Sequence, residues 1–100
     1  MNEKEIIKLL NQLFEIEKKS TKSDDAIKID RNIARIKSMF EEQGIKIKNP
    51  LHESYQDTRT DIDAEIDGDP SKKLTITEVL KPILYKDNQL IQKGLVIVEN

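Results

Sequence analysis

The chain has 100 residues, with 17 Lys and Arg against 19 Asp and Glu, no cysteine, and a formal net charge of −2. This length corresponds to one domain, and the lack of cysteine excludes disulfides, thiolate metal sites and cysteine nucleophiles. No apolar run approaches the roughly 20 residues of a membrane-spanning helix, and no basic patch with interleaved aromatic residues supports nucleic-acid binding. The first residues lack the basic start and apolar core of a signal peptide, so we expect a cytoplasmic protein without a membrane or nucleic-acid partner.

The first apolar pattern predicts a helix from Glu3 to about Lys19. Its apolar residues recur at i, i+3, i+4 and i+7, which is the spacing of one helix face. They are Ile6, Leu9, Leu10 and Leu13, and Ile7, Phe14 and Ile16 widen the stripe. A stripe of this breadth indicates contact with more than one neighbouring element.

A second helix is predicted from a polar connection at Ser20–Ser23 to about Gln43. Ser23 or Asp24 can cap its first turn, and Gly44 suits the residue just beyond its end, because glycine enters the left-handed region freely. The apolar residues follow a 3-4-3-4 spacing typical of a helix–helix seam. These are Ala26, Ile29, Ile33, Ile36 and Phe40.

The two apolar stripes are too wide for two helices to cover each other. Because the connection is short, the helices should be antiparallel neighbours, and either the chain's own sheet or a second chain must cover the rest. A dimeric four-helix bundle is the economical solution. We therefore predict an α+β fold in which residues 1–45 form an N-terminal antiparallel helical hairpin for a dimeric four-helix bundle, and residues 46–100 form a small all-β domain.

The second half of the chain has the alternating pattern of β-strands. Ile62, Ala64 and Ile66 alternate with acidic residues, which predicts a half-buried strand with an acidic outer face. Further strands are expected at Leu74–Leu80, Ile83–Tyr85 and Leu90–Val98. Pro82 should mark a sheet edge or a kink, because proline cannot donate to a sheet ladder.

No catalytic or metal-binding pattern stands out. His52 is the only histidine and no nucleophile pattern surrounds it, so we expect a structural role with its ring nitrogens bonded locally. The acids from Asp63 to Asp69 fit a calcium loop poorly, because Leu74 stands where the bidentate glutamate belongs. We expect a binding protein, not an enzyme, with no cofactor or metal.

The order of the segments carries a family resemblance. A helical region ends at Gly44, the junction Asn49-Pro50-Leu51-His52-Glu53 follows, and a β-patterned half ends in Leu95-Val96-Ile97-Val98. This order resembles the C-terminal part of GrpE, the nucleotide exchange factor of DnaK-type chaperones. The segment Ile76 to Lys81 is similar to the strand before the family's Gly-Tyr, and the segment Leu90 to Val98 to its last strand.

The resemblance implies a homodimer that binds the nucleotide-binding domain of a DnaK-type chaperone and promotes ADP release. The implied docking residues match the family's docking strand and turn: Tyr85, Asn88, Gln89, Gln92 and Val98. The implied dimerisation residues lie on the two helices: Leu9, Leu13, Ile29, Ile33, Ile36 and Phe40.

Some positions depart from the family pattern. Gln89 and Gln92 stand where the last strand of the family has arginines, and Pro82-Ile83 stands where it has Gly-Tyr. Loss of those charges would weaken an ion-paired interface. The alternative is therefore a dimeric adaptor that keeps the GrpE scaffold but lacks exchange activity, since a fold does not fix a function.

Overall fold

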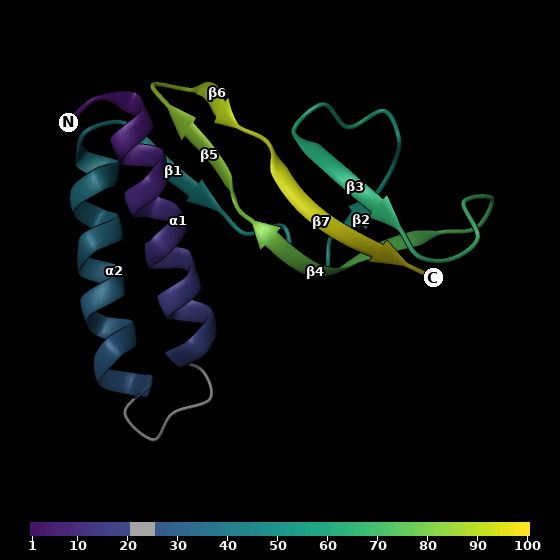
Figure 1. Ribbon diagram of the computed structural model, residues 1–100, viewed down its shortest axis with the longest axis horizontal. Helices are drawn as coiled ribbons and strands as arrows, with labels where there is room; N and C mark the ends of the chain where they lie inside the picture. Colours follow the sequence, from purple (N-terminus) through teal and green to yellow (C-terminus); the bar gives the residue numbers. More distant parts are fainter. Residues whose placement is uncertain (21–25) are drawn as a thin grey trace.

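A computed structural model describes residues 1–20 and 26–100, with backbone only for residue 20 and residues 26–29. Two helices and seven strands follow one another in this part of the chain. They are α1 (Glu3–Ser20), α2 (Ala26–Glu42), β1 (Ile45–Lys48), β2 (Ser54–Tyr55), β3 (Ile62–Ile66), β4 (Leu74–Lys81), β5 (Ile83–Lys86), β6 (Gln89–Gln92) and β7 (Gly94–Glu99). Both predicted helices are confirmed, and they run antiparallel at one end of the molecule (Figure 1). The predicted connection and cap, Ser23 or Asp24, lie outside the described residues.

The strands form two sheets. One has the order β1-β5-β6, and the other has the order β2-β4-β7-β3, in which β3 runs parallel to β7. Pro82 separates β4 from β5 as the chain passes from one sheet to the other, so the strand is interrupted at the predicted position and β5 does not continue β4. The single strand expected from Leu90 to Val98 is wrong, because the chain crosses back at Lys93 and gives β6 and β7. The crossing is tight: a Cβ atom on Gly94 would lie 2.9 Å from Ile83 Cγ1.

The helices pack on the three-stranded sheet of their own chain. Ile45 of β1 and Leu84 of β5 join four helix residues in one buried cluster. The helix members are Ile6, Leu10, Leu13 and Ile33. The predicted dimeric four-helix bundle followed by a small all-β domain is therefore wrong: the described residues contain two helices, and the sheet covers the buried part of their apolar stripes. Sheet side chains supply some of the apolar contacts that a second pair of helices would have supplied.

The predicted dimerisation residues divide between core and surface. Leu13 and Ile33 are buried, and Phe40 is half-buried against the same cluster. Leu9 and Ile36 are exposed, with 44% and 38% of their surfaces accessible. The side chain of Ile29 lies outside the described part of the chain. Self-association itself stays a prediction.

A second buried cluster joins α1 to strands of both sheets. Phe14 reaches from α1 into a group of strand residues, so one helix contacts both sheets. The strand members are Ile62, Leu74, Ile76, Val79, Ile83, Val96 and Val98. The two clusters together fix the orientation of the helices relative to the strands.

The Asn49–Glu53 junction is a hydrogen-bonded turn tied to β4. The Leu51 amide donates to Asn49 Oδ1 at 3.2 Å, and the Glu53 amide donates to the Pro50 carbonyl at 3.1 Å. His52 has φ 72°, in the left-handed region, and its amide donates to the Ile76 carbonyl at 2.9 Å. Its side chain is exposed, and no hydrogen bond of its ring occurs within the described ranges, so the expected local bonding is not found. The backbone of His52, rather than its ring, forms the turn.

Candidate functional site

The predicted docking residue Tyr85 lies in a row of side chains across the three-stranded sheet. It is directly opposite Lys46 of β1 on one side and Leu90 of β6 on the other. Leu84, its neighbour along β5, points into the helix cluster. Because successive strand residues alternate between faces, the row Lys46–Tyr85–Leu90 lies on the face opposite to Leu84, where Tyr85 packs at its edge against the second cluster. Leu90 is exposed there, with 39% of its surface accessible.

The turn that joins β5 to β6 is braced against the end of α2. Asp87 and Asn88 have φ values of 50° and 66°, the left-handed pair that tight two-residue hairpins require. The Asp87 amide donates to the Gly44 carbonyl at 2.8 Å. Gly44 itself has φ 80°, and a Cβ atom there would clash with the Asp87 carboxylate. The hairpin is therefore held at its tip, with Asn88 and Gln89 exposed.

Gln92 is occupied by contacts within the chain. Its side-chain Nε2 donates to Asn11 Oδ1 at 2.9 Å and to the Pro82 carbonyl at 2.9 Å. Its Oε1 accepts a hydrogen bond from Asn11 Nδ2 at 3.0 Å. This reciprocal amide pair joins α1 to the crossing between the sheets. Gln92 thus holds the helix against the sheet and is only half-exposed.

The structure does not bring the five predicted docking residues onto one surface. Tyr85 lies on the outward face, and Gln89 pairs with Lys86 opposite Ile45, on the helix side of the sheet. Val98 is in the second buried cluster with none of its surface accessible. Lys46 and Leu90 were not among the sequence predictions. Alternation along a β5–β6 hairpin would have put Leu90 beside Tyr85.

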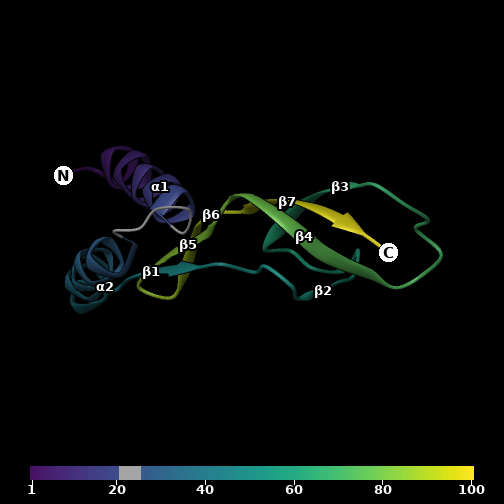
Figure 2. The same ribbon diagram turned by 90° about the horizontal axis from the view of Figure 1, so that it is seen from below.

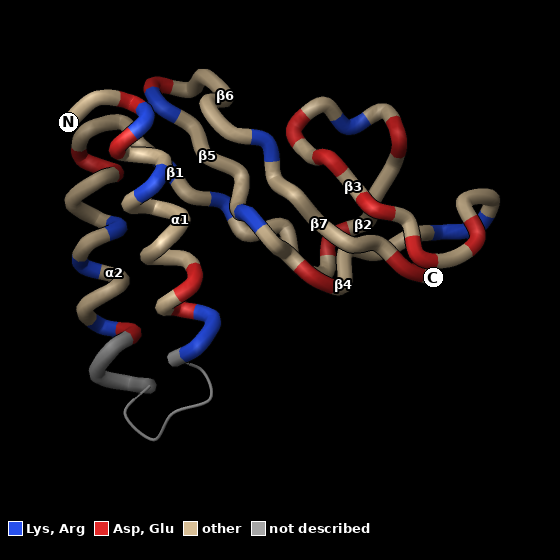
Figure 3. The backbone as a smooth tube through the Cα atoms, in the orientation of Figure 1, with Lys and Arg blue, Asp and Glu red and all other residues tan. Residues whose placement is uncertain are grey.

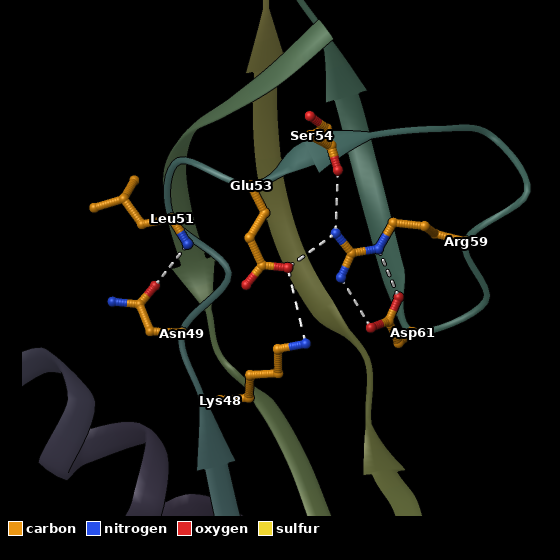
Figure 4. A network of polar contacts seen from close by, with 7 residues as sticks. All are labelled: Lys48, Asn49, Leu51, Glu53, Ser54, Arg59 and Asp61. Atoms are coloured by element: carbon orange, nitrogen blue, oxygen red, sulfur yellow. Dashed lines mark hydrogen bonds and ion pairs between the residues drawn. The ribbon is translucent and has the colours of Figure 1, made fainter.

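A polar network lies where the Asn49–Glu53 turn meets the start of β3 (Figure 4). Arg59 Nη2 is 3.0 Å from Asp61 Oδ2, Arg59 Nε donates to Asp61 Oδ1 at 3.1 Å, and Arg59 Nη1 is 3.2 Å from Glu53 Oε1. Arg59 also donates to the Ser54 carbonyl at 3.2 Å, and Lys48 Nζ lies 3.8 Å from Glu53. Two nitrogens of the planar guanidinium bind the two oxygens of the Asp61 carboxylate, which is a bidentate pair. The network holds the loop before β3 against β2.

This network shifts two protonation equilibria. Hydrogen bonding from Arg59 lowers the pKa of Asp61, against an opposing effect of burial, and the same pairing raises the pKa of Arg59. The Asp61 side chain is about a fifth exposed, at 22%. Protonation of Asp61 therefore weakens the fold, because the ionised carboxylate is the form that the guanidinium binds.

We expect the Asp61→Asn variant to lose roughly 1.5 kcal/mol of unfolding free energy near neutral pH, the low end for hydrogen bonds to charged groups. The folded pKa lies below the unfolded value, so the contribution is present above the unfolded pKa of about 3.9 and disappears as the pH falls through the folded pKa. Urea unfolding at several pH values would measure this difference. If the difference in unfolding free energy between the wild-type chain and the variant did not shrink at acid pH, the stabilisation would not come from ionised Asp61.

The described residues offer no metal site and no membrane-spanning helix. No group of three or more His, Asp or Glu side chains among them is arranged to hold a metal ion. Asp63 and Glu65 are exposed on β3, as the predicted acidic outer face requires. Neither helix within the described ranges is long and apolar enough to cross a membrane.

Comparison of the chain with models of known protein families, with curated proteins and with solved structures found no match.

Proposed function

We propose that this chain is a GrpE-like co-chaperone: a non-enzymatic, cytoplasmic protein that docks on the nucleotide-binding domain of a DnaK-type chaperone and promotes ADP release. The observation that carries the proposal is the outward row Lys46–Tyr85–Leu90, with an exposed leucine beside a tyrosine on a braced hairpin. The choice of a DnaK-type chaperone as the partner comes from the resemblance of the chain to the GrpE family.

The row has the composition of a small docking surface. Aromatic residues anchored in a rigid scaffold contribute most of the energy of many protein interfaces. Tyr85 packs against the second cluster and has its position fixed by that contact. Leu90 adds an accessible apolar side chain next to it, and Lys46 adds a positive charge that takes part in no ion pair of the described residues.

The mechanism would be differential binding. A ligand shifts a conformational equilibrium only by the difference in its affinity for the two states. The resemblance to GrpE implies that the β-strand part of the chain would hold the lobes of the chaperone open, and the open cleft would retain ADP poorly. A hairpin fixed by Asp87 and by the Asn11–Gln92 pair deforms little, which suits that role. By reciprocity, ADP then weakens docking by the same factor by which docking weakens ADP binding.

Stopped-flow release of a fluorescent ADP analogue from a DnaK-type chaperone tests the proposal. We expect saturating protein to accelerate release by about tenfold or more, equivalent to about 1.4 kcal/mol off the barrier. The Leu90→Asp variant should lose most of this acceleration, because it would bring an unpaired charge into an apolar contact. Ile66→Asp is the matched control, since Ile66 is 45% exposed at the end of β3 in the other sheet.

No acceleration at saturating protein would contradict exchange activity. The alternative function, an adaptor without exchange activity, is favoured by one observation: Gln92 stands at the position of a family arginine and is consumed by its pair with Asn11. Unchanged ADP release, together with pull-down of a partner other than the chaperone by the wild-type chain but not by Leu90→Asp, would support the adaptor.

A further inference from the structure

The outward face of the four-stranded sheet carries a regular arrangement of side chains centred on β7. The strand register puts Ile97 directly between Glu65 of β3 and Glu78 of β4. The next row has Leu95 between Asp63 and Lys81, and the row beyond Ile97 pairs Glu99 with Thr75. The alternate residues Val96 and Val98 are buried, which assigns these rows to the opposite face.

This face is not covered by any described element. Figure 2 shows both helices at one end of the molecule, beside β1, β5 and β6, and away from β3, β4 and β7. Leu95 is 37% exposed, and Ile97 is half-buried. An aliphatic strip therefore runs along the middle of an open sheet.

The charges around the strip are mostly negative. Figure 3 shows acidic positions along β3 and at the C-terminal end of β7. Asp63 is paired with Lys93 at 3.8 Å, and Lys81 stands at the same end of the strip. Around Ile97, however, Glu65, Glu78 and Glu99 take part in no ion pair among the described residues. The acidic character is thus concentrated at the Ile97 end.

We propose that this face binds a basic segment of a partner protein in which aliphatic residues are flanked by Lys or Arg. The apolar contact would fall on Ile97 and Leu95, and the cationic side chains would reach Glu65 and Glu78 on either side. The negative charge makes nucleic acid and anionic membranes poor partners, because both carry phosphates that these carboxylates repel. The surface is separate from the Lys46–Tyr85–Leu90 row, and the proposal does not depend on the proposed exchange activity.

The two components of the surface act differently. Exposed ion pairs alone are weak and are screened by salt, so lysines without apolar neighbours should bind poorly. An aliphatic residue that covers Ile97 excludes water from the flanking pairs and strengthens them. Binding should therefore need both the charge and the apolar side chain, and it should weaken as the salt concentration rises.

Titration of the full chain with short synthetic peptides, followed by NMR of the backbone amides, tests this proposal. The probe is a blocked peptide in which leucines are flanked by lysines. One control peptide has serine for each leucine, and a second has glutamate for each lysine. We expect shift changes confined to β3, β4 and β7 with the first peptide and none with the other two.

The double variant Glu65→Gln, Glu78→Gln should raise the dissociation constant of the lysine–leucine peptide by at least about fivefold, because it removes the charges flanking Ile97. The control Glu3→Gln, Glu42→Gln removes two exposed helix carboxylates and should change nothing. Ile97→Thr should also weaken binding while keeping the strand. Equal binding by the Glu65/Glu78 variant, equal binding by the serine peptide, or shifts centred on the helices would each overturn the proposal.

Discussion

Replacing Leu84 with alanine should lower the free energy of unfolding by about 2–5 kcal/mol, the range for removing a buried leucine side chain. Leu84 has none of its surface accessible and lies in the cluster that joins β5 to both helices. The substitution would leave a cavity where the helices pack on the three-stranded sheet. Urea unfolding followed by circular dichroism at a helix wavelength would measure the loss, because the helices should unfold together with the sheet.

The neighbouring strand provides the control for this experiment. Leu90 faces outward on β6 with 39% of its surface accessible, so Leu90→Ala should change the unfolding free energy by no more than about 0.5 kcal/mol. Similar losses for the two variants would mean that Leu84 is not packed against the helices. A helix transition separate from the sheet transition would likewise contradict a shared core.

The second large effect is expected at the amide pair between α1 and the sheet crossing. Gln92→Ala should cost about 1–3 kcal/mol, because it leaves the Asn11 side chain and the Pro82 carbonyl without their partner in a half-buried site. Asn11→Ala should cost less, since Gln92 keeps its bond to Pro82. The unfolding free energies of both single variants and the double variant would be compared.

The double-mutant cycle isolates the pair itself. Residues in direct contact usually couple by about 0.5–3 kcal/mol, whereas distant residues add within a few tenths. We expect coupling in that range for Asn11 with Gln92. As a control, Asn88→Ala combined with Asn11→Ala should be additive, because Asn88 is exposed at the hairpin turn. Additive losses for Asn11 and Gln92 would show that the amide pair contributes nothing.

Gln92 and Val98 do not face a partner in this fold. The position of Gln92 matches a family arginine in the last strand, yet here the side chain is turned toward α1. Val98 likewise matches a docking position and is buried. Matching along the chain preserves order but does not say which face a residue occupies. Within β6, the register shift opposite Leu84 and Tyr85 puts Leu90 and Gln92 on different faces of the sheet.

The sequence by itself determined the local elements. Apolar residues at intervals of three and four predicted both helices, Gly44 indicated the end of the second helix, and Pro82 indicated an edge or a kink where β4 ends. Alternation also predicted β3 with its exposed acids. These signals depend on backbone conformations and periodicities that are set within a few residues, so they can be read without knowing the rest of the fold.

Only the tertiary structure decided what covers the helices and which strand residues reach the surface. A periodic stripe shows which face of a helix is apolar but is equally satisfied by a sheet or by another helix. The pairing of β1 with β5 brings Ile45 and Leu84 together, and these two residues pack against the buried part of that face. The division of the last segment at Lys93 and Gly94, and the inward turn of Gln92, depend on contacts with Ile83, Pro82 and Asn11. Those residues lie outside β6 and β7, and no pattern within a strand encodes their approach.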